Sequence, residues 1–290
     1  MNFNYYPGCS LHGAAADYRM SINAICRRLK MDLTEIEDWN CCGATAASSE
    51  NYKMALVLAA LNLVKCENES ELVVACNACY QRLLNVNSKF KKYPAIKEEI
   101  TAVLAEFGIS GDPEKIKVRH LLEIFLEEVG LEKIKSNIVK PLSELRLIPY
   151  YGCMLVRPEG FDDPEQPTAL DELLTALGAQ VLPFYRKTRC CGNAVMSTNE
   201  KTALKMIKEI LEEAHFRGGQ AIVVTCPVCQ LNLDAYQDKV NKEFGTSYNI
   251  PVLYFTQAMG LAFGIGPNKL GFDRGIVPRE DLLKLIPKIE

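Results

Sequence analysis

The sequence predicts an α/β protein of two pseudo-symmetric halves, each built on a largely parallel β-sheet. Three observations support this fold class: strand-like and helix-like segments alternate along the chain, ten of the twelve cysteines form two matching sets of five, and the residues around these cysteines are repeated. Alternating strands and helices produce layered folds with parallel sheets. The chain of 290 residues, 48% of them hydrophobic, is long enough for two such domains.

The cysteines indicate a duplication. Each set consists of a lone Cys, a Cys-Cys-Gly segment and a CxxC motif, with spacers of 31 and 33 residues in the first set and 36 and 34 in the second. The two sets are Cys9, Cys41, Cys42, Cys76 and Cys79, and Cys153, Cys190, Cys191, Cys226 and Cys229. A repeat of about 145 residues is too long for a solenoid and fits a duplicated domain. We therefore expect domains at residues 1–144 and 145–290.

The same order of elements is expected in both halves. A strand precedes the lone Cys and a helix follows it, a second strand leads to the vicinal pair and a second helix follows, and a buried strand then ends at the CxxC motif. In the first half the strands are expected at 2–6, 33–39 and 72–74, and the helices at 14–30, at 50–66 and from 79. In the second half the strands are expected at 146–151, 179–185 and 221–224, and the helices at 168–177, at 199–216 and from 229. Residues 118–130 also resemble residues 252–264, and about 91–117 form a charged helical insertion that has no counterpart of equal length.

These positions bring the cysteines together. In open α/β sheets, ligands bind outside the carboxyl ends of the strands. Since each cysteine motif follows a strand, cysteines distant in sequence are expected to meet at one edge of the sheet. The helices that follow have unpaired N–H groups and positive dipole ends, which favour thiolates and anionic clusters.

Composition and charge exclude several classes of protein. The 33 basic and 36 acidic side chains leave a net charge of −3, which argues against a nucleic-acid-binding face of clustered Lys and Arg. No cationic region followed by an apolar segment begins the chain, and the longest apolar run, 54–61, is too short to span a membrane. We expect a cytoplasmic protein without direct membrane insertion. There, cysteines stay reduced, so they indicate metal binding or thiol chemistry rather than disulfides.

Five cysteines per half exceed the four ligands of a structural zinc or of a cubane iron–sulfur cluster. Three interpretations are open at this point: a zinc ion with one spare cysteine, a thioredoxin-type redox CxxC, and an iron–sulfur centre with all five thiolates. The redox CxxC leaves the vicinal pair and the lone Cys unexplained. Adjacent cysteines rarely direct both sulfurs at one metal, which favours a centre with more than one iron.

Further motifs accompany the cysteines. They are Tyr-Tyr-Gly-Cys at 150–153, Arg-Pro at 157–158, Phe-Asp-Asp-Pro at 161–164, Leu-Gly-Ala at 177–179, Thr-Cys-Pro-Val-Cys-Gln at 225–230 and Thr-Gln-Ala-Met-Gly at 256–260. With the order lone Cys, Cys-Cys-Gly and CxxC, they make the sequence resemble the cysteine-rich CCG-domain family and, within it, the B subunits of heterodisulfide reductase. The resemblance covers essentially the whole chain, although the second spacers are slightly short.

The resemblance implies a cofactor, a reaction and partners. Each five-cysteine set would hold a non-cubane 4Fe–4S cluster, and the two clusters themselves would be the catalytic groups. The mixed disulfide of coenzyme M and coenzyme B would bind between them and be reduced to two thiols, as in methanogenic archaea. Electrons would come from the heterodisulfide reductase C subunit, with cubane clusters, and from the flavin-bearing A subunit, which bifurcates electrons from hydrogenase or formate dehydrogenase. We expect no flavin or nicotinamide on this chain, which has no motif for either.

Two other functions compete with this one. The first is a CCG-type iron–sulfur electron-transfer subunit of another dehydrogenase or sulfur-metabolism complex. In such subunits the vicinal set often occurs with ferredoxin-type CxxCxxC runs, and this sequence has none. The second is a zinc-stabilised scaffold without redox chemistry.

The halves differ in charge just before the vicinal pair. Residues 36–40 include two acids and no base, whereas residues 185–189 include three bases and no acid. One hypothesis is that Lys187 or Arg189, together with Arg157, binds an anionic group of the substrate. The alternative is a solvated basic loop or a docking surface for the electron donor.

The remaining cysteines and histidines are expected to be structural. Cys26 lies on the apolar face of its predicted helix and Cys66 ends another, so both are predicted to be core cysteines. His12 follows the first lone Cys and is expected to cap or brace the local loop rather than contact a cluster. His120 and His215 are expected in helical segments.

Overall fold

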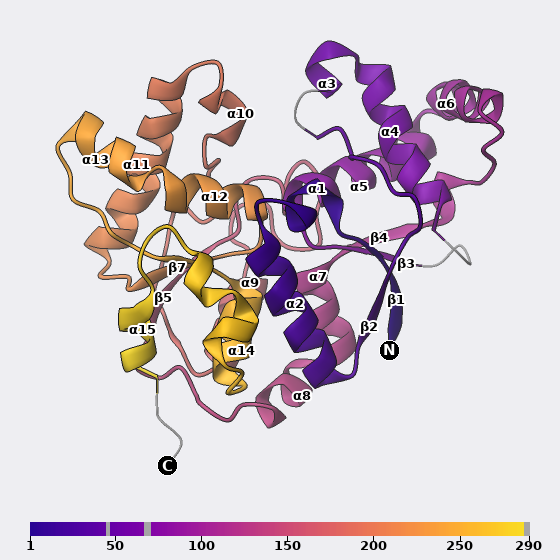
Figure 1. Ribbon diagram of the computed structural model, residues 1–290. Helices are drawn as coiled ribbons and strands as arrows, with labels where there is room; N and C mark the ends of the chain where they lie inside the picture. The colour runs from indigo at the N-terminus through magenta and orange to yellow at the C-terminus, as the bar shows by residue number, and fades with distance from the viewer. Residues whose placement is uncertain (45–46, 67–70, 287–290) are drawn as a thin grey trace.

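The computed structural model describes residues 1–44, 47–66 and 71–286 (Figure 1). In this part of the chain two four-stranded sheets occur, both fully parallel, in the orders β2-β1-β3-β4 and β6-β5-β7-β8. The first sheet consists of β1 (Asn2–Tyr6), β2 (Asp32–Glu35), β3 (Glu71–Val74) and β4 (Lys117–His120). The second consists of β5 (Arg146–Tyr150), β6 (Gln180–Val181), β7 (Ala221–Val224) and β8 (Val252–Tyr254). The same strand order in both sheets confirms the predicted duplication and fold class.

The helices alternate with these strands. In the first half they are α1 (Gly8–His12), α2 (Ala16–Leu29), α3 (Ala47–Glu50), α4 (Tyr52–Val64), α5 (Asn77–Lys92), α6 (Pro94–Glu106), α7 (Leu121–Ile124) and α8 (Leu131–Ser136). In the second they are α9 (Ala169–Ala176), α10 (Asn193–Met196), α11 (Glu200–Phe216), α12 (Pro227–Ala235), α13 (Gln237–Phe244), α14 (Phe255–Ala262) and α15 (Glu280–Lys284). The long helices bury an apolar stripe: in α11 this stripe includes Leu204, Ile207 and Leu211, at the spacing of one helix face.

The second strand of each half is shorter than predicted. β2 ends at Glu35, and the following turn includes Asp38 in the left-handed region, with φ +49°. β6 ends at Val181, because Pro183 has no N–H group with which to continue the ladder. The vicinal cysteines are therefore reached through loops rather than directly from strands.

Two other segments differ in detail from the prediction. The helix expected at 50–66 is divided at Asn51, whose side chain accepts a hydrogen bond from the Met54 amide and begins α4. The charged segment at about 91–117 contains α6 and a single turn at Pro113–Lys115, while its ends belong to α5 and β4.

The two halves pack against each other through α2 and α14, which lie side by side in Figure 1. The rings of Tyr18 and Tyr254 stack with centroids 4.0 Å apart, and the Ser21 and Thr256 hydroxyls are 2.6 Å apart. All four side chains are fully buried. One hydrophobic core includes residues of both halves, so the two sheets are held in a fixed relation.

Candidate metal centres

The carboxyl ends of the strands position the ten predicted cysteine ligands. Cys9 and Cys153 each lie three residues after the first strand of their half. Cys76 and Cys226 lie two residues after β3 and β7 and occupy the N-cap positions of α5 and α12. Because β1 pairs with β3 and β5 pairs with β7, these motifs emerge side by side at one edge of each sheet.

The cysteine sulfurs form one continuous row across both halves. The Sγ atoms of Cys42 and Cys79 are 3.3 Å apart, and those of Cys76 and Cys226 are 4.0 Å apart. Side-chain hydrogen bonds join the other neighbours, which are Cys41–Cys42, Cys76–Cys79, Cys226–Cys229, Cys191–Cys229, Cys190–Cys191 and Cys153–Cys190. Cys9 interacts electrostatically with Cys41 at one end. We call these ten residues the sulfur row; its two five-cysteine sets meet at Cys76 and Cys226.

Neighbouring thiols in the sulfur row differ in pKa. Hydrogen bonds with Cys41 and Cys79 lower the pKa of Cys42 to about 3. Hydrogen bonds from Cys153 and Cys191 lower the pKa of Cys190 to about 2. In each half, one vicinal cysteine is therefore more acidic than an ordinary thiol, and the thiolate is the form that binds metals.

The chemical type of these ten ligands fits an iron–sulfur site. All ten side chains are thiols, and soft sulfur ligands favour iron–sulfur clusters, zinc or copper(I). Within the described residues, no group of three or more His, Cys, Asp or Glu is placed to hold one metal ion. The sulfurs instead contact one another in pairs along the sulfur row, so the ligands are spread over a length of chain rather than gathered around one point.

The two ends of the sulfur row differ in exposure. Cys9 and Cys41 are exposed, whereas Cys153 and Cys190 are only partly exposed. The six other cysteines are buried. The first-half set is therefore the more accessible of the two from solvent.

A glycine before each lone Cys allows the chain to pass close to the CxxC motif. Gly8 has φ +71°, and a Cβ atom there would lie 3.1 Å from the Sγ of Cys79. Gly152 has φ +70°, and its Cβ would lie 3.0 Å from the Sγ of Cys229. Only glycine combines this backbone conformation with so close an approach.

A tyrosine in each half fixes the loop that carries the vicinal pair. The Tyr6 hydroxyl donates to the Asn40 carbonyl at 2.8 Å, and the Tyr150 hydroxyl donates to the Arg189 carbonyl at 2.6 Å. Burial, followed by the charge of Cys79, raises the pKa of Tyr6; burial and Cys229 do the same for the pKa of Tyr150. Both hydroxyls therefore keep their protons. Sequence reasoning did not select them, although the repeat alignment places each tyrosine three residues before its lone Cys.

Two side chains tie the CxxC motifs of the two halves together. The Tyr18 hydroxyl lies 3.2 Å from the Ala75 carbonyl and 3.3 Å from the Thr225 carbonyl, which directly precede the two motifs. The Asn77 side-chain amide donates to the Tyr151 carbonyl at 2.7 Å and to the Thr225 hydroxyl at 3.0 Å. These buried contacts fix the separation of the two CxxC motifs, and sequence reasoning did not predict them.

The predicted substrate-binding cations have different surroundings. Lys187 is buried, and its ammonium group donates to the Pro167 carbonyl at 2.8 Å and to Asp171 at 3.0 Å. Arg157 pairs with Glu165 at 2.9 Å, and its guanidinium also donates to the Thr188 carbonyl, which places it beside the basic loop.

Arg189 is the third predicted cation, directly before the second vicinal pair. It is exposed, and its side chain has no partner among the residues that the structure describes. Within the described residues, Lys187 and Arg157 therefore have internal partners, whereas the Arg189 guanidinium has none.

The leftover cysteines lie in the core as predicted. Cys26 and Cys66 are 6% and 7% exposed. Burial, with the nearby charge of Asp32, raises the pKa of Cys26 to about 12, so this thiol stays protonated. Neither residue contributes to the sulfur row.

The histidines lie in three different environments. His12 pairs with Glu35 at 3.2 Å at the surface, which agrees with a local role in the loop. His215 lies in α11, as predicted. The prediction for His120 was wrong: it is the last residue of β4, and its side chain caps α7. The strand was not predicted because its sequence, Lys-Val-Arg-His, is charged and lacks the apolar pattern of a buried strand.

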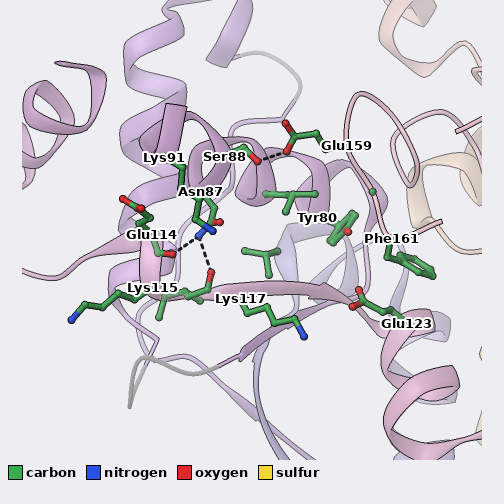
Figure 2. Close-up of a pocket in the computed structure, with 14 residues that line it drawn as sticks. Tyr80, Asn87, Ser88, Lys91, Glu114, Lys115, Lys117, Glu123, Glu159 and Phe161 are labelled. Atoms are coloured by element: carbon green, nitrogen blue, oxygen red, sulfur yellow. Dashed lines mark hydrogen bonds between the residues drawn. The ribbon is translucent and has the colours of Figure 1, made fainter. Parts of the chain in front are cut away.

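A pocket of about 410 Å³ opens between α5, β4 and the loop 159–161 (Figure 2). Tyr80, Phe161 and Glu123 lie toward one end, and Lys91, Glu114 and Lys115 lie toward the other. None of the ten cysteines lines this pocket. Tyr80, which lines this pocket, directly follows Cys79 in α5.

Fold and site together define a duplicated, cysteine-rich α/β protein with one five-cysteine set in each half. The cysteine-rich CCG domain matches twice, at residues 3–83 and 148–234. The chain therefore belongs to the CCG cysteine-rich domain family, which confirms the resemblance found in the sequence.

Relatives of the chain are components of larger reductases. The chain is 34% identical over 279 residues to the 8-methylmenaquinol:fumarate reductase membrane anchor subunit of Wolinella succinogenes, covering 95% of this chain and 96% of the relative. It is 33% identical over 293 residues to the B subunit of the ferredoxin:CoB-CoM heterodisulfide reductase of Methanosarcina mazei, covering 98% and 96%. A protein of Archaeoglobus profundus, named for its likeness to the heterodisulfide reductase B subunit, is 30% identical, covering 99% and 98%.

A solved structure shares the fold. A hypothetical protein from Helicobacter pylori superposes with a TM-score of 0.73 at 12% identity, covering 96% of this chain and 52% of that one. At this identity the likeness concerns the fold alone. None of the helices that the structure describes has the length and apolar character needed to span a bilayer.

Proposed function

We propose that this chain is the disulfide-reducing component of a heterodisulfide reductase, acting on the mixed disulfide of coenzyme M and coenzyme B. The observation that carries the proposal is the sulfur row, in which two five-cysteine sets meet at Cys76 and Cys226, 4.0 Å apart. Each set would hold one non-cubane 4Fe–4S cluster. The relatives from Methanosarcina and Archaeoglobus support the proposed reaction, since one is a heterodisulfide reductase B subunit and the other is named for its likeness to such a subunit.

A disulfide needs two electrons and two protons to become two thiols, so a centre that supplies single electrons must act twice or work together with a second centre. A bound iron–sulfur cluster supplies single electrons and iron that accepts a thiolate. The contribution of this chain is to hold two such sites side by side. Tyr18 and Asn77 fix the two CxxC motifs, while Tyr6 and Tyr150 fix the two vicinal pairs.

The substrate carries anionic groups at both ends, and a partly buried site needs fixed cations to bind them. Arg189 directly precedes the second vicinal pair and has a free guanidinium among the described residues, while Arg157 lies beside the same loop. The charge of Lys187 is already balanced by Asp171. We therefore assign anion binding to Arg189, with Arg157 as its neighbour, and a structural role to Lys187.

Electrons would reach this chain from a partner protein. The relatives named above are components of multi-subunit reductases. The exposed edge at Cys9 and Cys41 makes the first half the side on which a cubane-bearing C subunit, itself served by the flavin-bearing A subunit, would dock. The partly exposed Cys153 and Cys190 would then lie on the substrate side.

The second candidate is an electron-transfer component of a fumarate-reductase-type complex. The Wolinella relative, which matches over 95% of the chain, favours it. Both candidates use the same cysteines, so they differ in substrate rather than in the metal centre. Reduction of the mixed disulfide by the isolated chain with an artificial electron donor would support the first candidate, and failure of that reaction with intact clusters would favour the second.

The cluster assignment is tested on anaerobically purified protein. We expect iron rather than zinc, with about four iron atoms for each five-cysteine set. Cys42→Ala should remove or convert only the first-half cluster, and Cys191→Ala only the second. Cys26→Ala is the matched control, because Cys26 is buried outside the sulfur row and should leave the iron content unchanged. Full iron content and unchanged spectra in both ligand variants would contradict the assignment.

A further inference from the structure

Arg82 lies beside the first five-cysteine set. It belongs to α5 and follows Cys79 by three residues, so the two side chains lie on one face of the helix, with Cβ atoms about 5–6 Å apart. Helical side chains lean toward the N-terminus, which directs Arg82 back toward Cys79. The Sγ of Cys79 in turn lies 3.3 Å from that of Cys42. Arg82 is therefore one helical turn from a cysteine that contacts the vicinal pair.

The second half shows which way this helix position faces. The repeat aligns Arg82 with Asn232, since each lies three residues after the last cysteine of its CxxC motif. Asn232 is buried, and its side-chain amide donates to the Cys191 carbonyl at 2.9 Å. Cys191 is the counterpart of Cys42 in the repeat. The equivalent position in α5, which Arg82 occupies, therefore faces the first vicinal pair.

The charge of Arg82 has no internal counter-ion among the residues that the structure describes. The side chain is half-buried, its Nε–H group is fully buried without a hydrogen-bond partner, and no carboxylate of the described residues pairs with its guanidinium. The pKa of Cys42 is lowered by its hydrogen bonds with Cys41 and Cys79 and also by the charge of Arg82. A charge that is partly removed from water needs a partner, and the sulfur site is the anionic group beside it.

We propose that Arg82 compensates part of the negative charge of the cluster held by the first five-cysteine set and thereby raises the reduction potential of that cluster. Reduction adds one electron to the cluster and breaks no bond, so a fixed positive charge stabilises the reduced form more than the oxidised form. Net charge is among the factors that set the potentials of iron–sulfur clusters. The inference rests on the proposed cluster assignment and goes beyond it, because the uncharged Asn232 gives the second half no equivalent of this cation.

Two substitutions separate the charge of Arg82 from its shape. Arg82→Gln removes the charge and keeps an N–H donor, whereas Arg82→Lys keeps the charge and loses the planar guanidinium. Arg217→Gln is the matched control. Arg217 is also half-buried with a buried, unpartnered Nε–H group in the described structure, but it lies four residues before β7 begins, at the opposite edge of the sheet from Cys226.

The experiment is a redox titration of the anaerobic protein with both clusters bound, followed by electron paramagnetic resonance, with iron content measured on the same samples. The signals are assigned to the halves with Cys42→Ala and Cys191→Ala. We expect Arg82→Gln to make the first-half cluster about tenfold harder to reduce, which corresponds to 59 mV for one electron, with the second-half cluster unchanged. Arg82→Lys should keep the wild-type potential, and Arg217→Gln should leave both potentials unchanged.

Three results would overturn the inference. The first is an unchanged first-half potential in Arg82→Gln, or equal shifts of both clusters. The second is the same shift in Arg82→Lys as in Arg82→Gln, because a purely structural role depends on the shape of the side chain rather than on its charge. The third is a higher KM for the mixed disulfide in Arg82→Gln at unchanged potentials, which would identify Arg82 as a cation that binds the substrate.

The potentials do not depend on the identity of the substrate. If they respond as expected but the mixed disulfide is not reduced, only the proposed reaction fails. If the wild-type protein reduces the mixed disulfide and Arg82→Gln leaves the potentials unchanged, only this inference fails. If wild-type protein binds no iron–sulfur cluster, the proposed function and this inference are both refuted.

Discussion

The substitution Gly152→Ala, which adds one methyl group, tests the arrangement of the second five-cysteine set. Gly152 has φ +70°, and an added Cβ would lie 3.0 Å from the Sγ of Cys229. So short a contact forces the sulfur to move by a few tenths of an ångström or the turn to open. In Gly152→Ala we therefore expect a displaced Cys229 ligand and a perturbed second-half cluster.

The size of the effect follows from two contributions. A left-handed backbone conformation costs a residue with a Cβ about 1–2 kcal/mol relative to glycine. For a chain of this size that corresponds to a fall in Tm of about 2–8 °C. The contact with Cys229 adds to this cost, and it alone affects the metal centre. Iron content and the spectrum of the second-half cluster should therefore change in addition to stability.

Gly245 provides the matched control. It has a similar conformation, with φ +65°, but no heavy atom of the described structure lies within 4 Å of its added Cβ. Gly245→Ala should lower the Tm by the conformational cost alone and leave iron and spectra unchanged. Gly8→Ala, with its Cβ 3.1 Å from Cys79, should perturb the first-half cluster instead. Wild-type iron content and spectra in Gly152→Ala, or the same cluster changes in Gly245→Ala, would refute the reasoning.

Three further predictions concern the loop before the second vicinal pair. Tyr150→Phe leaves the Arg189 carbonyl without its donor, so the free energy of unfolding should fall by about 0.5–1.5 kcal/mol in denaturant titrations, and an unchanged value would show that the bond contributes nothing. Arg189→Gln should raise the KM for the mixed disulfide roughly ten- to hundredfold with both cluster spectra intact. Lys187→Gln should mainly lower stability, because Asp171 loses its partner; slower electron delivery in Arg189→Gln at unchanged KM would identify a docking surface instead.

The sequence predicted the duplication and the convergence of the cysteines because both follow from spacing and from the geometry of parallel sheets. It did not predict β4. The strand consists of Lys117–His120, whose Arg119 is 1% exposed and forms an ion pair with Glu123 at 2.7 Å. A buried charge depends on partners brought together by the fold, and hydrophobic periodicity does not show them.

The basic segment before Cys190 also depends on partners that the fold brings together. Its charges can be counted in the sequence, but the sequence does not show that Asp171 neutralises Lys187 or that Arg186 pairs with Glu209. The tyrosine hydrogen bonds were also missed. In the sequence, Tyr6 and Tyr150 cannot be distinguished from ordinary core aromatic residues. Only the folded structure shows the loop carbonyls to which their hydroxyls donate.

The differences between the halves are as informative as the duplication. A symmetric pair of sulfur sites would suit a symmetric substrate, whereas the proposed mixed disulfide has two unlike ends. The molecule departs from symmetry at three places that border the sulfur row: exposed Cys9 against partly exposed Cys153, His120 against Tyr254, and an acidic against a basic approach to the vicinal pair. If electrons enter at the exposed first half and the second half carries the anion-binding cation, a single duplicated fold provides both an entry site and a substrate site.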